Sequence, residues 1–589
     1  MKNVLKVARE YGLAVMLCLL ILTFVMQLWR ADLRVPFTYF GDSMYGSIAI
    51  KGTIERGWWW SNPALGAPGG LNYGAFPVMD NTQFLLIKVL TLFSQNHAVI
   101  LNLFYLLTFP LTTVTSLFVF RQLKLSYLAG VVGSLLYTFL PYHFFRAYHI
   151  HMAAYYLLPL IIHVTLWVFA GPLIFGQPSG GRWPKLELNF KTVFALLVAV
   201  LVGGCGIYYP FFSCFFLLGA GALGSLQQKR IYPLLSAITL AVVIAGAVVI
   251  SMTPMFLYQR SHGAAPLGTR TVADAETMGL KITQLLLPIG GHRVPALRSL
   301  KYRYNLGPLV NENDTSSLGF IGSVGFLLLL FRIFYQKPPA PILDQLSWLN
   351  LLGVLMGTIG GFGVLFALLV SPQIRAYNRI SVFIAFFSLT AVAVLLDSFY
   401  KSLKTRVGWL AVIALTALLI SAGVYDQTAS TFFFVPEYEK TQEEYRSDAE
   451  FVSQIEAAVP PESMIFQLPY IRFPENPPVQ KMTQDCEPAK AYLHSKRLRW
   501  SYGALKGGEV EQWQQAVAAQ PTARFIDEIR AAGFKGIYIN RNGYADNAED
   551  LERQITSILA IKPIINRGGY LSFFPLTSEP AYAVRQLRK

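Results

Sequence analysis

An aspartate follows the first apolar run of the chain, in the sequence Tyr39-Phe40-Gly41-Asp42-Ser43. A carboxylate at this place, close to a membrane surface, is a credible general base. Asp42 is equally suited to cap a helix, because its side chain can accept hydrogen bonds from free amides of the residues that follow. Asp80 allows the same two interpretations, and the segment 62–70 between the two aspartates is dense in turn-forming residues.

A second group of polar side chains lies at the outer end of the third expected membrane span. It comprises Tyr142, His143, Arg146, His149 and His151. Imidazole and guanidinium groups can bind phosphate or another substrate, and imidazoles can also ligate a metal. An interfacial belt of aromatic and histidine residues is the alternative interpretation.

Two further segments concentrate positive charge. Arg375 and Arg379 are four residues apart, so they share one face if the segment is helical. Snorkelling to the membrane interface explains one such arginine more easily than a pair. The loop 258–316 is also basic, which suits either a lipid-linked phosphate or anionic headgroups. Its cationic and histidine residues are Arg260, His262, Arg270, Lys281, His292, Arg293, Arg298, Lys301 and Arg303.

The composition shows what must position these groups. Of the 589 residues, 54% are hydrophobic and only 14% are charged, and the mean hydropathy is +0.43. Soluble domains carry nearer a quarter of charged residues. The sequence predicts a polytopic α-helical membrane protein with about eleven spans of roughly 20 residues each. The expected spans are 11–29, 97–120, 126–142, 153–171, 190–207, 209–226, 231–257, 317–335, 349–370, 379–398 and 408–424.

Positive residues in the short loops predict the orientation. They favour a cytoplasmic N-terminus, and an odd number of spans then sends the C-terminus outside. The first span lacks a small-residue cleavage site and is expected to be retained. We expect a transmembrane domain over 1–424, with outward loops 30–96 and 258–316, and an extracytoplasmic α/β domain over 425–589 in which helical and strand-like patterns alternate.

Several functional classes are disfavoured. No phosphate-binding loop, dinucleotide fingerprint, zinc-protease helix or nucleophile elbow is present. The four cysteines form no pattern typical of a disulfide framework or a thiolate metal site. The formal charge of +16 suits anionic lipids or phosphates. It does not suit nucleic acid, because the basic residues are dispersed among the spans.

The architecture resembles the GT-C superfamily of membrane glycosyltransferases, and within it the bacterial YfhO-like multi-pass proteins. The segment 36–81, with Gly41-Asp42 and the sequence at 62–66, carries most of the likeness. The resemblance implies a hexosyl- or pentosyltransferase of the bacterial inner membrane. Such an enzyme moves a sugar from a polyprenyl-phosphate donor to a glycan or lipid acceptor on the outer face. It also implies that Asp42 is the catalytic acidic residue and leaves a divalent metal open as cofactor.

The next outward loop departs from the family pattern, because it has histidines and Arg146 where a second acidic residue is common. In the expected mechanism Asp42 deprotonates or orients an acceptor hydroxyl while basic groups neutralise the departing phosphate, with inversion at the sugar C1. The expected substrate contacts are Tyr39, Asp80, Tyr142, His143, Arg146, His149, His151, Arg375 and Arg379. A transporter of lipid-linked glycans, or a scaffold for envelope assembly, is the alternative function.

Overall fold

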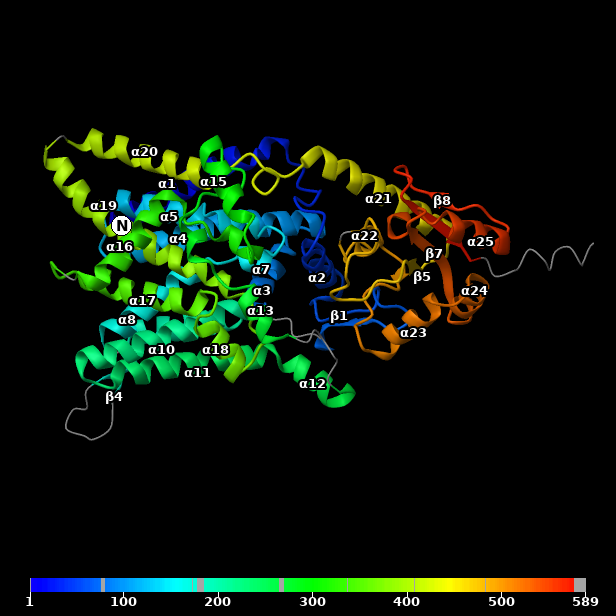
Figure 1. The fold of residues 1–589 in the computed structure, drawn as a ribbon, viewed down its shortest axis with the longest axis horizontal. Coiled ribbons are helices and arrows are strands. Elements are labelled where there is room, and N and C mark those ends of the chain that lie inside the picture. The colour runs from blue at the N-terminus through cyan, green and yellow to red at the C-terminus, as the bar shows by residue number, and fades with distance from the viewer. Residues whose placement is uncertain are drawn as a thin grey trace, which may run out of the picture.

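The computed structural model describes residues 2–75, 80–171, 173–176, 185–263, 270–335, 337–406, 408–482 and 484–576. A helical bundle occupies one end of the elongated molecule and an α/β part the other (Figure 1). The long helices of the bundle are α1 (Lys2–Met26), α4 (His97–Gln122), α5 (Tyr127–Thr138), α8 (Leu158–Ala170), α9 (Phe190–Gly203), α10 (Tyr208–Gln228), α11 (Tyr232–Ser251), α16 (Gly319–Phe334), α17 (Pro341–Gly357), α19 (Ser381–Arg406) and α20 (Trp409–Gln427).

Seven helices of the described chain are long and apolar enough to cross a membrane. They are Val4–Met26, His97–Gln122, Tyr127–Phe145, Tyr208–Gln228, Tyr232–Ser251, Tyr377–Lys404 and Trp409–Gln427. Three shorter apolar helices, α8, α9 and α16, accompany them. The predicted count of eleven is not confirmed. One reason is that the expected span 349–370 is interrupted, since α17 ends at Gly357, α18 (Phe362–Leu369) begins five residues later, and Gly360 between them has a left-handed φ of +72°.

Shorter elements connect the spans. The first outward loop contains α2 (Ser43–Arg56) and α3 (Asn81–Leu90). The remaining elements are α6 (Pro141–Phe145), α7 (Ile150–Ala153), α12 (Thr253–His262), α13 (Val272–Thr277), α14 (Ile282–Leu286), α15 (Pro295–Asn305), and the strand pairs β1 (Ser61–Asn62) with β2 (Leu71–Asn72) and β3 (Phe175–Gly176) with β4 (Lys185–Leu186).

Five strands in the last part of the chain form one sheet in the order β6-β5-β7-β9-β8. β5 pairs in parallel with β6 and β7, while β9 pairs antiparallel with β7 and β8. The strand-like patterns expected within 425–589 are confirmed by strands such as β5, β7 and β9. The bounds are β5 (Met464–Leu468), β6 (Arg499–Trp500), β7 (Phe534–Asn540), β8 (Ile564–Ile565), β9 (Leu571–Pro575), α21 (Tyr438–Ala458), α22 (Ala489–His494), α23 (Glu509–Ala518), α24 (Thr522–Ala531) and α25 (Glu549–Leu559).

The first outward loop is built into the edge of this sheet. The amide of Gly66 donates to Tyr502 O at 2.8 Å, and the amide of Ala67 donates to Trp500 O at 3.0 Å. Ala67 itself belongs to the apolar cluster under the sheet. These bonds cover the free edge of β6, which otherwise presents unpaired backbone groups. The loop 30–96 therefore joins the bundle to the α/β part.

Gly66 is required at this junction. Its φ is +71°, and a Cβ there would lie 3.0 Å from Gly70 C and 3.2 Å from the amide nitrogen of Ala504, both backbone atoms. Gly57, at the end of α2, is a matched comparison, because its φ is +88° but a Cβ would meet nothing within 4 Å.

We expect Gly57→Ala to lower the free energy of unfolding by about 1 kcal/mol, the cost of a left-handed alanine. Gly66→Ala should cost about 2 kcal/mol or more, because the methyl group also presses on fixed backbone. Thermal unfolding in detergent measures both variants. Equal losses would show that the contact with the sheet edge adds nothing.

A candidate active site between the bundle and the α/β part

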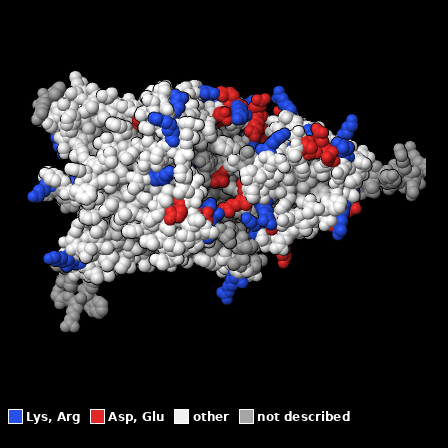
Figure 2. Space-filling model, viewed as in Figure 1, with Lys and Arg blue, Asp and Glu red and all other residues white. Residues whose placement is uncertain are grey.

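A cavity of about 430 Å³ lies where the bundle meets the α/β part. It collects residues from six regions that are far apart in the sequence. Six of the side chains expected to act in a site line it: Asp42, Asp80, His149, His151, Arg375 and Arg379. Figure 2 shows acidic side chains within the hollow between the two parts of the molecule. Their roles in catalysis or binding stay predictions.

Asp42 is turned into this cavity by the start of α2. Gly41, with a left-handed φ of +60°, makes the turn that precedes it. Asp42 is the N-cap residue of α2, but its side chain makes no capping hydrogen bond. Its Oδ2 atom instead lies 2.5 Å from Nε2 of His149. The carboxylate thus accepts a short hydrogen bond from the imidazole, and the capping interpretation does not describe it.

The two groups set each other's ionisation. Burial acts to raise the pKa of the Asp42 carboxyl, but the hydrogen bond and charge of His149 outweigh it, and the pKa is lowered from its usual value. Burial lowers the pKa of His149, and Asp42 only partly offsets this. His151, on the short helix α7, is buried more strongly, which lowers its pKa to about 3. Asp42 is therefore ionised at neutral pH and hydrogen-bonded to His149.

Glu312 is a residue of the site that the sequence analysis did not single out. It lies in a 3₁₀ turn, Asn311–Ser316, and its carboxylate is 3.0 Å from Nη2 of Arg146 and 3.1 Å from Nη2 of Arg379. Burial would raise the pKa of Glu312, but the two guanidinium groups hold it well below its usual range. One carboxylate between two arginines leaves this wall of the cavity with a net positive charge.

The two arginines of the segment 371–379 differ in what they are free to bind. Arg379 is fully engaged, since it makes a bidentate contact with Glu312 and its guanidinium lies 4.4 Å above the ring of Tyr208. Arg375 has a single ion pair, at 3.9 Å from Asp274, and its side chain is 30% exposed. Arg375 is thus better placed than Arg379 to take up a new anion in the cavity.

Asp80 contributes a different kind of acid. It precedes α3, makes no capping hydrogen bond and is only 4% exposed. Burial raises the pKa of its carboxyl well above the usual value. Asp80 lines the same cavity as Asp42.

Four expected contact residues do not line this cavity. His143 is buried between Thr108 and the carbonyl of Thr138, which bind its two ring nitrogens at 2.8 and 2.9 Å. The ring of Tyr142 is buried, and its hydroxyl lies 3.8 Å from Met152 Sδ. Tyr39 faces a neighbouring pocket instead. Arg146 is fully buried and reaches the cavity through Glu312.

The basic loop 258–316 does not supply the expected cluster of phosphate ligands. Lys301 is buried against Asp314 at 2.8 Å, and Arg270 forms an ion pair with Glu475. Arg293 donates to the carbonyls of Tyr425 and Thr428. These cations are paired with groups of the same chain, and among the described residues of this loop only Glu312 lines the cavity.

Aromatic rings from separate segments complete the lining. They are Tyr45, Trp59, Tyr73, Phe84, Tyr148, Tyr208 and Phe473. The sequence analysis missed most of them, because single aromatic residues in a membrane protein are ordinary and only the fold brings these together. The turn-rich segment 62–70 was the available signal that residues on either side of it lie close together, since it returns the chain from α2 toward α3.

The described residues do not fit a divalent metal at this place. Within the described ranges no three His, Cys, Asp or Glu side chains are placed to hold an ion. His149 directs Nε2 at the Asp42 carboxylate, and Glu312 is occupied by two guanidinium groups. No step is therefore derived through a metal.

Comparison of the sequence with models of protein families and with curated proteins gives no match. Among solved structures, the chain is similar to an Archaeoglobus fulgidus oligosaccharyltransferase with Zn and sulfate, with 13% identity, a TM-score of 0.44, and coverage of 90% of this chain and 68% of that one. It is similar to AglB of the same organism in complex with an inhibitory peptide and a dolichol-phosphate, with 12% identity, a TM-score of 0.47 and coverage of 90% and 69%. It is also similar to arabinofuranosyltransferase AftD from Mycobacteria, with 13% identity, a TM-score of 0.45, and coverage of 91% of this chain and 37% of that one. At TM-scores below 0.5 these likenesses establish neither a common fold nor a common activity.

Removing the charge of Glu312 should destabilise the site, since Glu312→Gln leaves buried Arg146 without its ion pair. The loss of one partner of a buried pair costs about 3–5 kcal/mol. The matched control is Glu439→Gln, which breaks the exposed Arg30–Glu439 pair and should cost much less, because solvent screens exposed charges. Thermal unfolding in detergent compares the two. Similar small losses would mean that Glu312 does not hold the arginines in place.

Proposed function

We propose that the protein is a GT-C-type glycosyltransferase of a bacterial inner membrane, with its α/β part outside. It moves a sugar from a polyprenyl-phosphate donor to a hydroxyl of an envelope glycan or lipid on the outer face. The observation that carries the proposal is the Asp42 carboxylate, held by His149 and facing a cavity that also contains Arg375 and several aromatic rings. The sequence resemblance to GT-C enzymes supports the same conclusion.

Asp42 is suited to act as the base. Its Oδ2 atom is taken by His149, which leaves Oδ1 for the acceptor hydroxyl. Because the pKa of Asp42 is lowered, the carboxylate is ionised at neutral pH and can accept a proton. His149 acts as a positioning residue, since its hydrogen bond fixes the rotation of the carboxylate. A base held in place in this way contributes roughly 10²–10⁴-fold to the rate.

Arg375 is suited to bind the donor phosphate. It lies in the same cavity as Asp42 and its only ion pair in the described chain is the long one with Asp274. A guanidinium group binds phosphate through two parallel hydrogen bonds. Arg379 and Arg146 add positive potential from behind Glu312, which stabilises the charge that develops on the leaving phosphate.

The aromatic side chains suit the sugar. Trp59 and Tyr73 form an edge-to-face pair with ring centroids 5.6 Å apart, and Phe473 lies 6.3 Å from Tyr73. Such rings offer apolar faces to the C–H surface of a pyranose or furanose ring, and Asp80 can hydrogen-bond to the sugar. The cavity volume of about 430 Å³ is within the usual range of small-ligand sites.

The transfer then balances without a cofactor. The acceptor oxygen forms a bond to the sugar C1 as its proton passes to Asp42 Oδ1. The bond between C1 and the phosphate oxygen breaks, and its electron pair stays with the polyprenyl phosphate beside Arg375. Attack from the side opposite the phosphate gives inversion at C1. The energy comes from the phosphate ester of the donor.

The test is transfer from radiolabelled polyprenyl-phosphate sugars to envelope glycans, in membranes that contain the wild type or Asp42→Asn at matched expression. Loss of the base should lower transfer about 10²–10⁴-fold while folding is unchanged. Asp32→Asn in the same outward loop is the control, because Asp32 lies outside the cavity lining, and it should transfer normally. Absence of transfer from every donor, or equal transfer by Asp42→Asn, would contradict the assignment and favour a transporter or a scaffold.

A further inference from the structure

A second polar pocket lies in the α/β part, apart from the cavity at Asp42. It has a volume of about 190 Å³ and opens at the end of β7, where Asn540 is the last residue of the strand. In sheets with parallel strands, ligands bind beyond the carboxyl ends of the strands. Its lining includes Glu444, Asp448, Glu487, Lys490, Tyr538 and Asn540.

The pocket is negative in a chain whose formal charge is +16. Three carboxylates, those of Glu444, Asp448 and Glu487, surround the single ammonium group of Lys490. Lys490 Nζ lies 2.5 Å from Glu444, and no other basic residue lines the pocket in the described chain. This balance repels phosphate and acidic sugars and favours a ligand that donates hydrogen bonds.

Hydrogen-bonding groups in the pocket remain available. Tyr538 is 3% exposed, and its hydroxyl lies near Asp448, Tyr570 and Glu487. That hydroxyl forms no hydrogen bond to any described residue. Glu487 accepts from Asn540 at 3.2 Å through Oε2. A tyrosine hydroxyl without a protein partner can donate to, and accept from, a ligand or water in the pocket.

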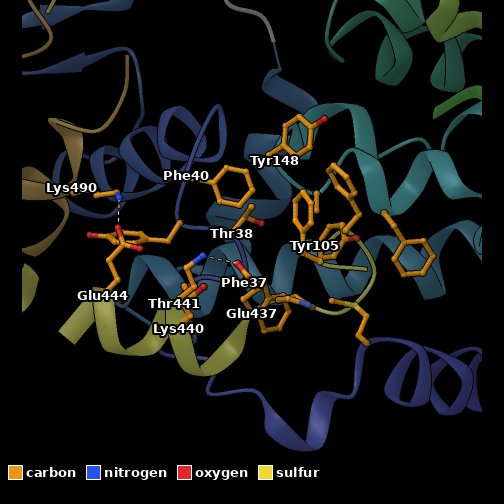
Figure 3. A pocket seen from close by; sticks show the side chains of 17 residues that line it. Phe37, Thr38, Phe40, Tyr105, Tyr148, Glu437, Lys440, Thr441, Glu444 and Lys490 are labelled. Carbon is orange, nitrogen blue, oxygen red and sulfur yellow. Dashed lines mark hydrogen bonds and ion pairs between the residues drawn. The ribbon is translucent and has the colours of Figure 1, made fainter. Parts of the chain in front are cut away.

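An aromatic pocket of about 240 Å³ adjoins this polar pocket and shares Glu444 and Lys490 with it. Figure 3 shows the Lys490–Glu444 pair at one end and the rings of Phe40 and Tyr148 farther along. Tyr148 also lines the cavity at Asp42. A chain of sugar units can therefore extend from the polar pocket, across aromatic faces, to the proposed base.

We infer that this polar pocket binds a neutral or amino-sugar-containing carbohydrate, which is the acceptor glycan if the proposed function holds. Sugar hydroxyls donate to the Glu487 carboxylate and accept from Tyr538 and Lys490. The adjoining rings pack against the C–H faces of neighbouring sugar units. The identification of this carbohydrate as the acceptor rests on the proposed function, but carbohydrate binding itself does not require transfer.

The test is binding of full-length protein in detergent to an array of neutral, amino-sugar and acidic oligosaccharides. The wild type should retain neutral or amino-sugar glycans and not acidic ones. Tyr538→Phe and Glu487→Gln should each weaken that binding about tenfold, because each removes one hydrogen bond or charge-assisted bond to the glycan. Tyr544→Phe and Glu528→Gln are the controls in the same α/β part, and they should bind as the wild type does.

Unchanged binding by both pocket variants, retention of acidic glycans, or retention of a lysine-rich peptide in place of glycans would overturn the inference. The proposed function is judged separately. Glycan binding without any transfer would support the glycan-binding role of the polar pocket and contradict the transferase function. Transfer in which Tyr538→Phe leaves KM for the glycan acceptor unchanged would support the transferase function and contradict a role of the polar pocket in acceptor binding. The expected result is a raised acceptor KM with an unchanged KM for the donor.

Discussion

The contact between Asp42 and His149 joins two segments that are far apart in the sequence. Its geometry depends on most of the elements around the cavity. Asp42 starts α2 in the first outward loop, and His149 lies between α6 and α7 at the end of the third span. Three residues before His149, buried Arg146 is held by Glu312 from a third segment, which also holds Arg379 from a fourth. Each buried charge has an opposite partner, as burial requires. A change at any of these positions therefore alters the geometry at Asp42.

The α/β part lies beside the site and also holds α2 in place through hydrogen bonds. Tyr45, one turn into α2, donates to Asp485 at 2.9 Å, and the thiol of Cys486 donates to the carbonyl of Gly41 at 3.0 Å. The ammonium group of Lys51 donates to carbonyls at the end of α22, at 2.6 Å for Tyr492 O. These bonds fix α2 from the outside while the spans fix His149 from the membrane side. We infer that an isolated bundle would leave Asp42 poorly positioned.

Part of this arrangement could be predicted from the sequence. Apolar runs reveal spans and strand-like runs reveal β5, β7 and β9, because both signals are local. The count of spans failed where glycines interrupt an apolar run, as at Gly360. Asp42, His149 and Arg375 were named as candidates from residue type and position relative to the spans. Glu312 was passed over because its loop is mainly basic, and His143 was included although it satisfies both ring nitrogens in the core. The contacts of Glu312 with two arginines and the two hydrogen bonds of His143 are tertiary contacts, so the sequence alone does not reveal them.

The most direct measurement of the central claim is the pH dependence of kcat/KM for sugar transfer in His149→Phe. In the wild type the lowered pKa of Asp42 keeps the base ionised to below the usual carboxyl range, so the rate falls only in strong acid. Without His149, the hydrogen bond and charge that oppose burial are lost, so the pKa of Asp42 should rise and the acid limb should move to higher pH. His163→Phe, a buried histidine away from the cavity, should leave the limb in place. An identical pH profile for His149→Phe and the wild type would contradict the account.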